Sequence, residues 1–141
     1  MGTITKDFSY SEFEKSEIAE AKGITNVITT FEVRDAIKAL VLTVLQPLRD
    51  AWGKPLYVNS GYRCDELNKA VGGVPTSQHV KGEAADIATD DPYSLANLAR
   101  DLNLPYDQMI LYPDFVHFSH KLIGVQRKQI LYNKRYSGKK L

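Results

Sequence analysis

Apolar residues in the first third of the chain recur at helical spacing. Between residues 33 and 48 the apolar side chains stand three or four positions apart, which is typical of a helix with one buried face. Thr29 and Glu32 have the spacing of a capping box, and Gly53 stands where a helix would end. Pro47 predicts a kink or a restart, because proline has no N–H to continue the helical ladder.

A shorter helix is predicted ahead of this one. Ser11 and Glu14 repeat the capping-box spacing, and Gly23 stands at the expected C-terminal end. We interpret both helices as scaffold, with Trp52 and the apolar stripe in the core.

The second part of the chain is patterned for short strands separated by loops. One or two helical turns are expected at residues 64–71, and Asp91 followed by Pro92 begins another helix. Predicted strands cover residues 56–58, 83–88, 108–112, 115–119 and 128–132. Pro113 and Asp114 suit the centre of a type I turn, so the strands on either side should form a hairpin. Helices first and strands later predict an α+β domain, in which N-terminal helices pack on a small, mainly antiparallel sheet.

Length and composition restrict what the chain can be. With 141 residues, 43% of them hydrophobic and 25% charged, residues 1–141 are expected to form a single globular domain. No apolar run approaches about 18 residues, so membrane insertion is not expected. The N-terminus lacks a basic stretch followed by an apolar one, which predicts synthesis in the cytoplasm without a secretory signal. The absence of a heptad pattern favours a monomer.

Charge is unevenly distributed along the chain. Residues 121–141 form a basic tail with seven basic and no acidic residues. Such a tail suits an anionic polymer, whether nucleic acid, a membrane surface or a bacterial wall, and a solvated, frayed chain end is the simpler interpretation. Its aromatic residues are Tyr132 and Tyr136 alone, so it lacks the stacking pattern of a nucleic-acid binder, and nucleic acid is not expected as a partner.

Polar side chains that suit a cleft lie in the second half of the chain. Asp86 stands within a small apolar run, where an unpaired carboxylate is costly and requires a basic side chain or a metal ion. In a strand, His117 faces the opposite side from Val116 and Phe118, so its imidazole can face a cleft. His120 should point the other way and lie at the surface.

His79, Asp86 and His117 together suggest a metal site. Two imidazoles and a carboxylate, with a fourth position left to water, are typical of catalytic rather than structural zinc sites. Zinc in such a site would polarise a carbonyl and activate water for hydrolysis of an amide. On spacing alone, half-buried histidines that bind no metal remain the alternative.

Longer motifs carry a resemblance to a known family. Three of them stand out together: SGYR at residues 60–63, SQHVKGEAAD at 77–86 and FVHFS at 115–119. With these motifs the chain, over roughly residues 8–132, resembles the M15 family of zinc peptidases, in particular the branch of bacteria and phages that acts on peptidoglycan peptides. The resemblance implies the compact α+β fold shared by D-alanyl-D-alanine peptidases and the Hedgehog signalling domain.

The resemblance also implies roles for individual residues. The family's ligands, for one Zn²⁺ per chain, fall on His79, Asp86 and His117. The family's arginine falls on Arg63, which would bind a substrate carboxylate or polarise the scissile carbonyl. Ser77 and Gln78 fall where family members line the substrate groove.

Four other residues near these motifs also have expected roles. Asp114 stands where many family members have a glutamate as general base, so we expect Asp114 to be the base, with a turn-forming role as the alternative. Tyr112 is a candidate for substrate binding and oxyanion stabilisation. Asp107 is expected either to orient a ligand histidine or to lie at the surface. Cys64 is expected to be an inert thiol, because the histidines of a Cys–His pair are better explained as ligands.

These observations predict a zinc-dependent metallopeptidase acting on peptidoglycan stem peptides, as a D-Ala-D-Ala carboxypeptidase or as an endopeptidase. The alternative is a non-catalytic wall-binding or phage-assembly module that keeps the fold. Because the substrate lies outside the cytoplasmic membrane, we expect an endolysin-like release to the cell wall by phage or prophage lysis.

Overall fold

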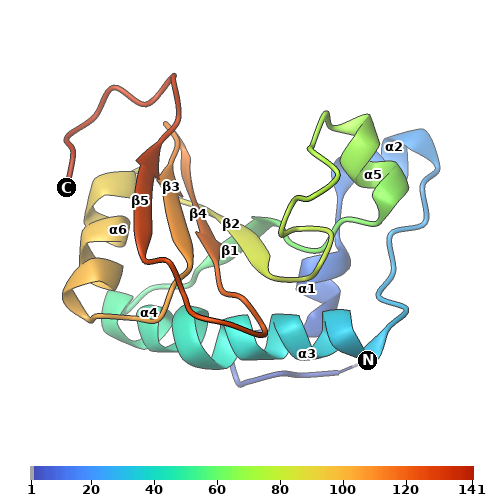
Figure 1. Cartoon of the computed structure of the whole chain (residues 1–141), viewed down its shortest axis with the longest axis horizontal. Coiled ribbons are helices and arrows are strands. Elements are labelled where there is room, and N and C mark those ends of the chain that lie inside the picture. Colours follow the sequence, from blue (N-terminus) through green and yellow to red (C-terminus); the bar gives the residue numbers. More distant parts are fainter. Residues whose placement is uncertain (1) are drawn as a thin grey trace.

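The computed structural model describes residues 2–141 (Figure 1). In chain order its elements are α1 (Tyr10–Glu14), α2 (Glu17–Lys22), α3 (Phe31–Leu40), the π-helical turn η1 (Val41–Leu45), α4 (Gln46–Trp52), β1 (Tyr57–Ser60), α5 (Asp65–Ala70), β2 (Ala84–Ala88), α6 (Pro92–Asp101), β3 (Gln108–Leu111), β4 (Phe115–Ser119) and β5 (Gln129–Tyr132). Each predicted strand is present, with small shifts at its ends. None of the helices among the described residues is both long enough and apolar enough to span a bilayer.

The five strands form one sheet in the order β1-β2-β4-β3-β5. Neighbouring strands are antiparallel except for β3 and β5, which run parallel. Residues 120–128 connect β4 to β5 past β3, so β5 begins at the end of the sheet where β3 also begins. The expected α+β class, with its hairpin of β3 and β4, is confirmed.

The long predicted helix is interrupted once. Thr30 caps α3, and its hydroxyl accepts the Val33 N–H at 3.2 Å, so the prediction of Thr29 as the cap is wrong by one residue. The π-helical turn η1 separates α3 from α4, and Pro47 lies in the first turn of α4, which confirms the predicted restart. Gly53 ends α4 with a φ of 75°.

The predicted first helix is split into two short helices, α1 and α2. Ser9 precedes α1, and its N–H donates to the Glu12 carboxylate at 3.0 Å. The predicted box of Ser11 and Glu14 is wrong because Ser11 already lies inside α1, and Glu14 accepts a backbone N–H from the loop after α2. Gly23 ends α2 as predicted, with a φ of 68°.

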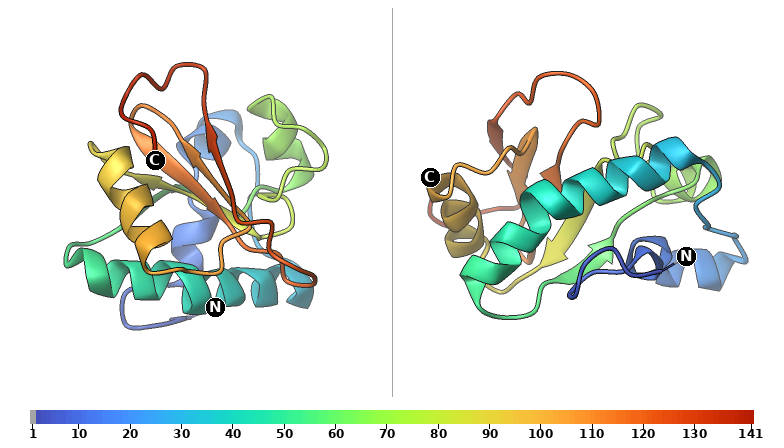
Figure 2. Two further views of the ribbon diagram at one scale, coloured as in Figure 1. Left: turned by 60° about the vertical axis from the view of Figure 1, so that its left-hand side comes forward. Right: turned by 90° about the horizontal axis from the view of Figure 1, so that it is seen from below.

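The core lies between the sheet and the helices (Figure 2). The core-facing side chains of the two central strands, Ala85 and Ile87 of β2 and Val116 and Phe118 of β4, are all 0% exposed. They pack with the apolar stripe of the long helix, and burial of this apolar surface is the main favourable contribution to folding. Strand side chains alternate between the two faces, so residues between these core positions face away from it.

Part of the basic tail is packed. The Tyr136 ring stacks on Tyr132 with 5.6 Å between centroids, and the Leu141 N–H donates to the Tyr132 hydroxyl at 2.8 Å. The Lys139 ammonium lies 4.9 Å from the centre of the Tyr93 ring in α6. The end of the chain therefore folds back toward α6 (Figure 1), and part of the tail packs while Lys134, Arg135, Lys139 and Lys140 stay exposed to solvent.

Candidate metal centre

Strands β2 and β4 bring a carboxylate and an imidazole together. Asp86 pairs directly with His117 in the antiparallel ladder, and the alternation of the strands turns both side chains away from the core face. His117 Nδ1 lies 2.9 Å from Asp86 Oδ1. Because directly opposite residues of such a ladder have Cβ atoms about 5 Å apart, the sheet itself fixes this pair.

The second imidazole comes from the loop that precedes β2. His79 Nε2 lies 3.3 Å from Asp86 Oδ1, and His79 Nδ1 lies 2.7 Å from the Gly61 carbonyl oxygen. A carbonyl oxygen only accepts, so Nδ1 carries a proton, and Nε2 is the ring nitrogen that faces Asp86 and can bind a metal ion when the imidazole is neutral. The Arg63 N–H donates to the His79 carbonyl at 3.1 Å, which ties the same loop to the segment after β1.

Two glycines allow the close backbone approach on which this loop depends. A Cβ atom on Gly61 would lie 2.7 Å from the Phe13 Cα atom in α1. A Cβ atom on Gly82 would lie 2.7 Å from the Val33 carbonyl oxygen in α3, and Gly82 has a φ of 75°. A side chain at either position would move the backbone that presents His79.

The centre of the site is a buried negative charge. The Asp86 residue is 8% exposed, and burial alone would raise the pKa of its carboxyl group. Contacts with His117 and His79, and the charge of their imidazoles, outweigh burial and hold the pKa of Asp86 well below its usual range. The carboxylate therefore stays ionised, and the Arg63 guanidinium is one cation near it.

This donor set fits a zinc ion. One ligand atom from each of His79, Asp86 and His117 lies within 4.8 Å of the other two. In a metal-bound site, His79 would be neutral, and its Nε2 and the carboxylate oxygen of Asp86 would both bind the ion. Zn²⁺ takes nitrogen and oxygen ligands, and three protein ligands leave a position open, as catalytic sites require. The structure thus brings the three predicted ligands together.

Arg63 is held beside the metal centre by neutral partners. Its Nε donates to Ser60 Oγ at 3.3 Å, and its Nη1 donates to Asn68 Oδ1 at 3.1 Å. Its Nη2 lies 3.9 Å from Asp86 Oδ2. Burial lowers the pKa of Arg63, and the Asp86 carboxylate acts in the opposite direction. The guanidinium remains protonated and keeps a fixed orientation.

A cavity of about 350 Å³ opens over the three candidate ligands. The other predicted site residues on its walls are Arg63, Ser77, Gln78 and Tyr112. Burial and the Asp86 carboxylate raise the pKa of the Tyr112 phenol, so its hydroxyl stays protonated and can donate a hydrogen bond. The cavity also has walls that sequence reasoning missed, namely Gln108 and Ile110 of β3 and Arg127 before β5.

Asp114 lies apart from this cavity. It is exposed in the turn between β3 and β4, where its carbonyl oxygen accepts the Thr89 N–H at 3.1 Å. Its neighbours in a separate depression include Lys134 and Arg135. Asp114 stands three positions before His117, an odd offset that places side chains of an extended chain on opposite faces. The structure therefore does not bring Asp114 to the ligands, and its position fits the turn-forming alternative.

Asp107 is buried, but it contacts neither ligand histidine. Its carboxylate accepts from Arg127 Nη2 at 2.6 Å, from Arg127 Nε at 3.1 Å and from Gln78 Nε2 at 3.2 Å. Both expectations for Asp107 are therefore wrong. The cause is the parallel pairing of β3 with β5, which sets Gln108 opposite Gln129 and so places Asp107 beside Arg127.

Cys64 and His120 are not among the residues that line the cavity. Cys64 is half-buried before α5, and its backbone N–H donates to Asn26 Oδ1 at 2.8 Å, which agrees with a structural thiol. His120 is half-buried rather than at the surface, because its Nδ1 lies 2.7 Å from the Pro105 carbonyl oxygen. Neither side chain belongs to the ligand cluster.

Comparison with known proteins finds similarity over most of the chain. The sequence model of the peptidase M15 family matches residues 6–120. The zinc D-Ala-D-Ala carboxypeptidase of Streptomyces albus G is 32% identical over 98 residues, which are 67% of this chain. The aligned part is 37% of that relative, so this chain corresponds to little more than a third of its length. The family match includes the three candidate ligands and Arg63, and it ends before Arg127.

Substitution of His117 in β4 and of His120 just after it tests the metal centre. We expect the wild-type chain to bind one Zn²⁺ and His117→Ala to bind it about 100-fold more weakly or not at all, because an imidazole ligand is lost. His120→Ala is the matched control and should bind zinc like the wild type. Zinc titration of metal-free protein against a chromophoric chelator measures both. Equal affinities of the two variants would contradict the site.

Acidification tests the Asp107 contacts. Burial raises the pKa of Asp107, but the hydrogen bonds and charge of Arg127 and the charge of Lys121 outweigh it, so the pKa is lowered. A carboxyl group whose pKa is lower in the folded than in the unfolded chain stabilises the fold at pH values above its unfolded pKa of about 3.9. This stabilisation is lost as the pH falls through the pKa of the folded chain.

We therefore expect Asp107→Asn to lower the free energy of unfolding by about 2 kcal/mol at pH 7, and by less as the pH approaches 3. Urea unfolding of metal-free protein over a pH series measures the difference. Asp101→Asn, at an exposed carboxylate of α6, is the control and should follow the wild-type curve. A constant difference between Asp107→Asn and the wild type at every pH would contradict the role given to Asp107.

Proposed function

Because the chain belongs to the peptidase M15 family, we propose that it is a zinc-dependent peptidase that hydrolyses peptide bonds in peptidoglycan stem peptides. The observation that carries the proposal is the convergence of His79, Asp86 and His117 below an open cavity. The name of the Streptomyces albus G relative, a zinc D-Ala-D-Ala carboxypeptidase, supports both the metal and the substrate class.

The three candidate ligands would hold the metal, and the rest of the site would hold the substrate. Zinc bound in such a set supplies a Lewis acid that polarises a carbonyl and lowers the pKa of water. The Gly61 carbonyl fixes the tautomer of His79, and the β2–β4 ladder fixes the orientation of His117 toward Asp86. The ligand set is therefore organised before the ion or the substrate arrives.

Arg63 and Tyr112 are the donors best placed to act on a substrate. The Arg63 guanidinium lies next to the ligands with two of its nitrogens already bonded to Ser60 and Asn68, so substrate binding need not immobilise a free side chain. We assign it to a substrate carboxylate or to the scissile carbonyl oxygen. The protonated Tyr112 hydroxyl, which lines the same cavity, would donate to the oxyanion that develops as that carbonyl is attacked.

The site lacks a second carboxylate among its described walls. Of the acidic residues in 2–141, only Asp86 lines the cavity, and Asp107 lies behind Gln78 and Arg127. Turnover should therefore not depend on Asp114. The same observation favours the second candidate function, a cell-wall-binding module that keeps the fold and the metal without hydrolysis.

Two isosteric substitutions test the enzyme against the binding module. Zinc-loaded wild-type protein should cleave purified peptidoglycan fragments, and a chelator should abolish the products. Asp86→Asn should lower turnover at least about 1000-fold, because it weakens a metal ligand. Asp114→Asn should keep most of the wild-type rate. Mass spectrometry of the fragments reports all of these rates.

The product masses also identify the peptide bond that is cleaved. Loss of a single alanine from pentapeptide stems identifies a carboxypeptidase, whereas fragments split within the stem identify an endopeptidase. Folded, zinc-loaded protein that binds the fragments and yields no product supports the wall-binding function. A large loss of turnover in Asp114→Asn would show that the turn moves in the working enzyme and that Asp114 is the base.

A further inference from the structure

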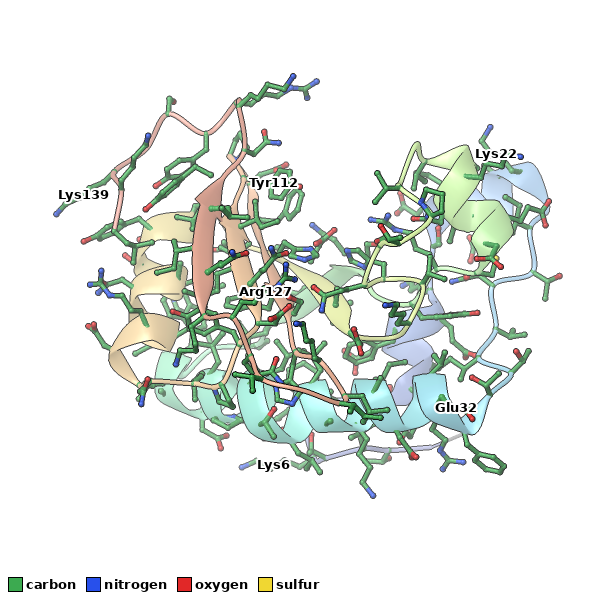
Figure 3. All side chains as sticks on the ribbon, viewed as in Figure 1. Lys6, Lys22, Glu32, Tyr112, Arg127 and Lys139 are labelled. Carbon is green, nitrogen blue, oxygen red and sulfur yellow. The ribbon has the colours of Figure 1, made fainter. Side chains whose placement is uncertain are left out.

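Arg127 is a cationic wall of the metal cavity that the metal chemistry does not use. It lies in the segment between β4 and β5 and lines the same cavity as the three candidate ligands. Figure 3 shows it near the middle of the molecule, beside the strands and with Tyr112 above it. It lies outside residues 6–120, which the model of the peptidase M15 family matches.

Asp107 holds the Arg127 side chain in one orientation. The Asp107 residue is 0% exposed, and its carboxylate accepts from Arg127 Nε, Nη2 and the backbone N–H at 3.1, 2.6 and 2.8 Å. Gln78 donates to the same carboxylate at 3.2 Å, so Asp107 also joins Arg127 to the loop that carries His79. A guanidinium fixed by a bidentate pair has already lost its rotamer freedom before any ligand binds.

The same guanidinium keeps donors for a ligand. Asp107 occupies the Nε side of the fork, and among residues 2–141 Nη1 makes no hydrogen bond. The Arg127 side chain is 43% exposed. The charge of Asp107 is shared with Lys121, whose Nζ lies 3.9 Å from Asp107 Oδ1, so the cluster of one carboxylate and two cations has a net positive charge. Such a group suits an anion in the cavity.

We propose that Arg127 binds a carboxylate of the substrate other than the group that Arg63 binds. Arg127 and Arg63 line one cavity, with Arg127 held by Asp107 and Arg63 held by Ser60 and Asn68. Arg127 therefore offers a carboxylate of the substrate a fixed guanidinium of its own, whichever group Arg63 binds. The substrate class is therefore a peptide with an acidic residue near the scissile bond. This inference rests on the proposed function.

A matched pair of peptides tests the proposal. The two peptides contain the bond that mass spectrometry of the peptidoglycan fragments shows to be cleaved. They differ at one position near that bond, which is glutamate in one peptide and glutamine in the other. Zinc-loaded wild-type protein should have a KM about 10-fold lower for the glutamate peptide. Arg127→Gln should raise the KM of the glutamate peptide to that of the glutamine peptide, while its zinc content stays at the wild-type value.

Arg100→Gln is the control for loss of a positive charge, because Arg100 lies in α6 and is not among the residues that line the cavity. It should keep the wild-type preference. Arg127→Lys should restore part of the preference, since a point charge lacks the planar fork. A glutamate preference that persists in Arg127→Gln overturns the proposal, as does a wild-type enzyme with no preference.

Failure of the proposed function gives a different result. If the zinc-loaded wild type cleaves neither peptide, the peptidase proposal fails, and calorimetric titration with the same two peptides still tests Arg127. Tighter binding of the glutamate peptide by the wild type, lost in Arg127→Gln, supports the carboxylate site. Equal binding of the two peptides by the wild type overturns it.

Discussion

The whole site depends on one buried carboxylate that faces two imidazole nitrogens. Asp86 is ionised, nearly inaccessible to water, and lies 2.9 Å from His117 Nδ1 and 3.3 Å from His79 Nε2. The hydrogen bond with His117 and the nearby Arg63 guanidinium offset part of the cost of burying this charge, and a metal ion held by the three candidate ligands would offset more of it. The register of β2 against β4 sets one of these contacts, and the Gly61 carbonyl sets the other by fixing the tautomer of His79.

The cavity is built on two buried carboxylates, each next to an arginine. Asp86 lies beside Arg63 on the side of β1 and α5, and Asp107 is bonded to Arg127 on the side of β3 and β5. The first pair belongs to the metal centre, and the second joins the segment before β5 to the loop that carries His79 through Gln78. The two pairs leave oriented guanidinium groups in one cavity, which is the basis for selecting an anionic peptide.

Local sequence patterns predicted the strands and the faces of their side chains, but they did not predict contacts between segments far apart in the sequence. The alternation around His117 and the apolar run around Asp86 predicted the strands and the faces on which these side chains lie. Capping positions were wrong by one or two residues, because several hydroxyl residues precede α1 and α3 and only the folded backbone selects one. The position of Arg127 in the cavity was not predicted, because it depends on the parallel register of β5 on β3. That register is set by packing and cannot be recognised in the local sequence of the basic tail. The expectation of Asp114 as the base followed from resemblance, whereas the turn that exposes its side chain was predicted from Pro113 and Asp114 themselves.

X-ray absorption spectroscopy of the zinc-loaded chain is the most direct test of the metal centre, because it reports the atoms bound to the metal. We expect a first coordination shell of nitrogen and oxygen only, with the multiple-scattering pattern of two imidazoles. Asp86→Asn should lose this spectrum together with bound zinc. A sulfur ligand from Cys64, a single imidazole, or an unchanged spectrum in Asp86→Asn would contradict the assignment of His79, Asp86 and His117 as the metal centre.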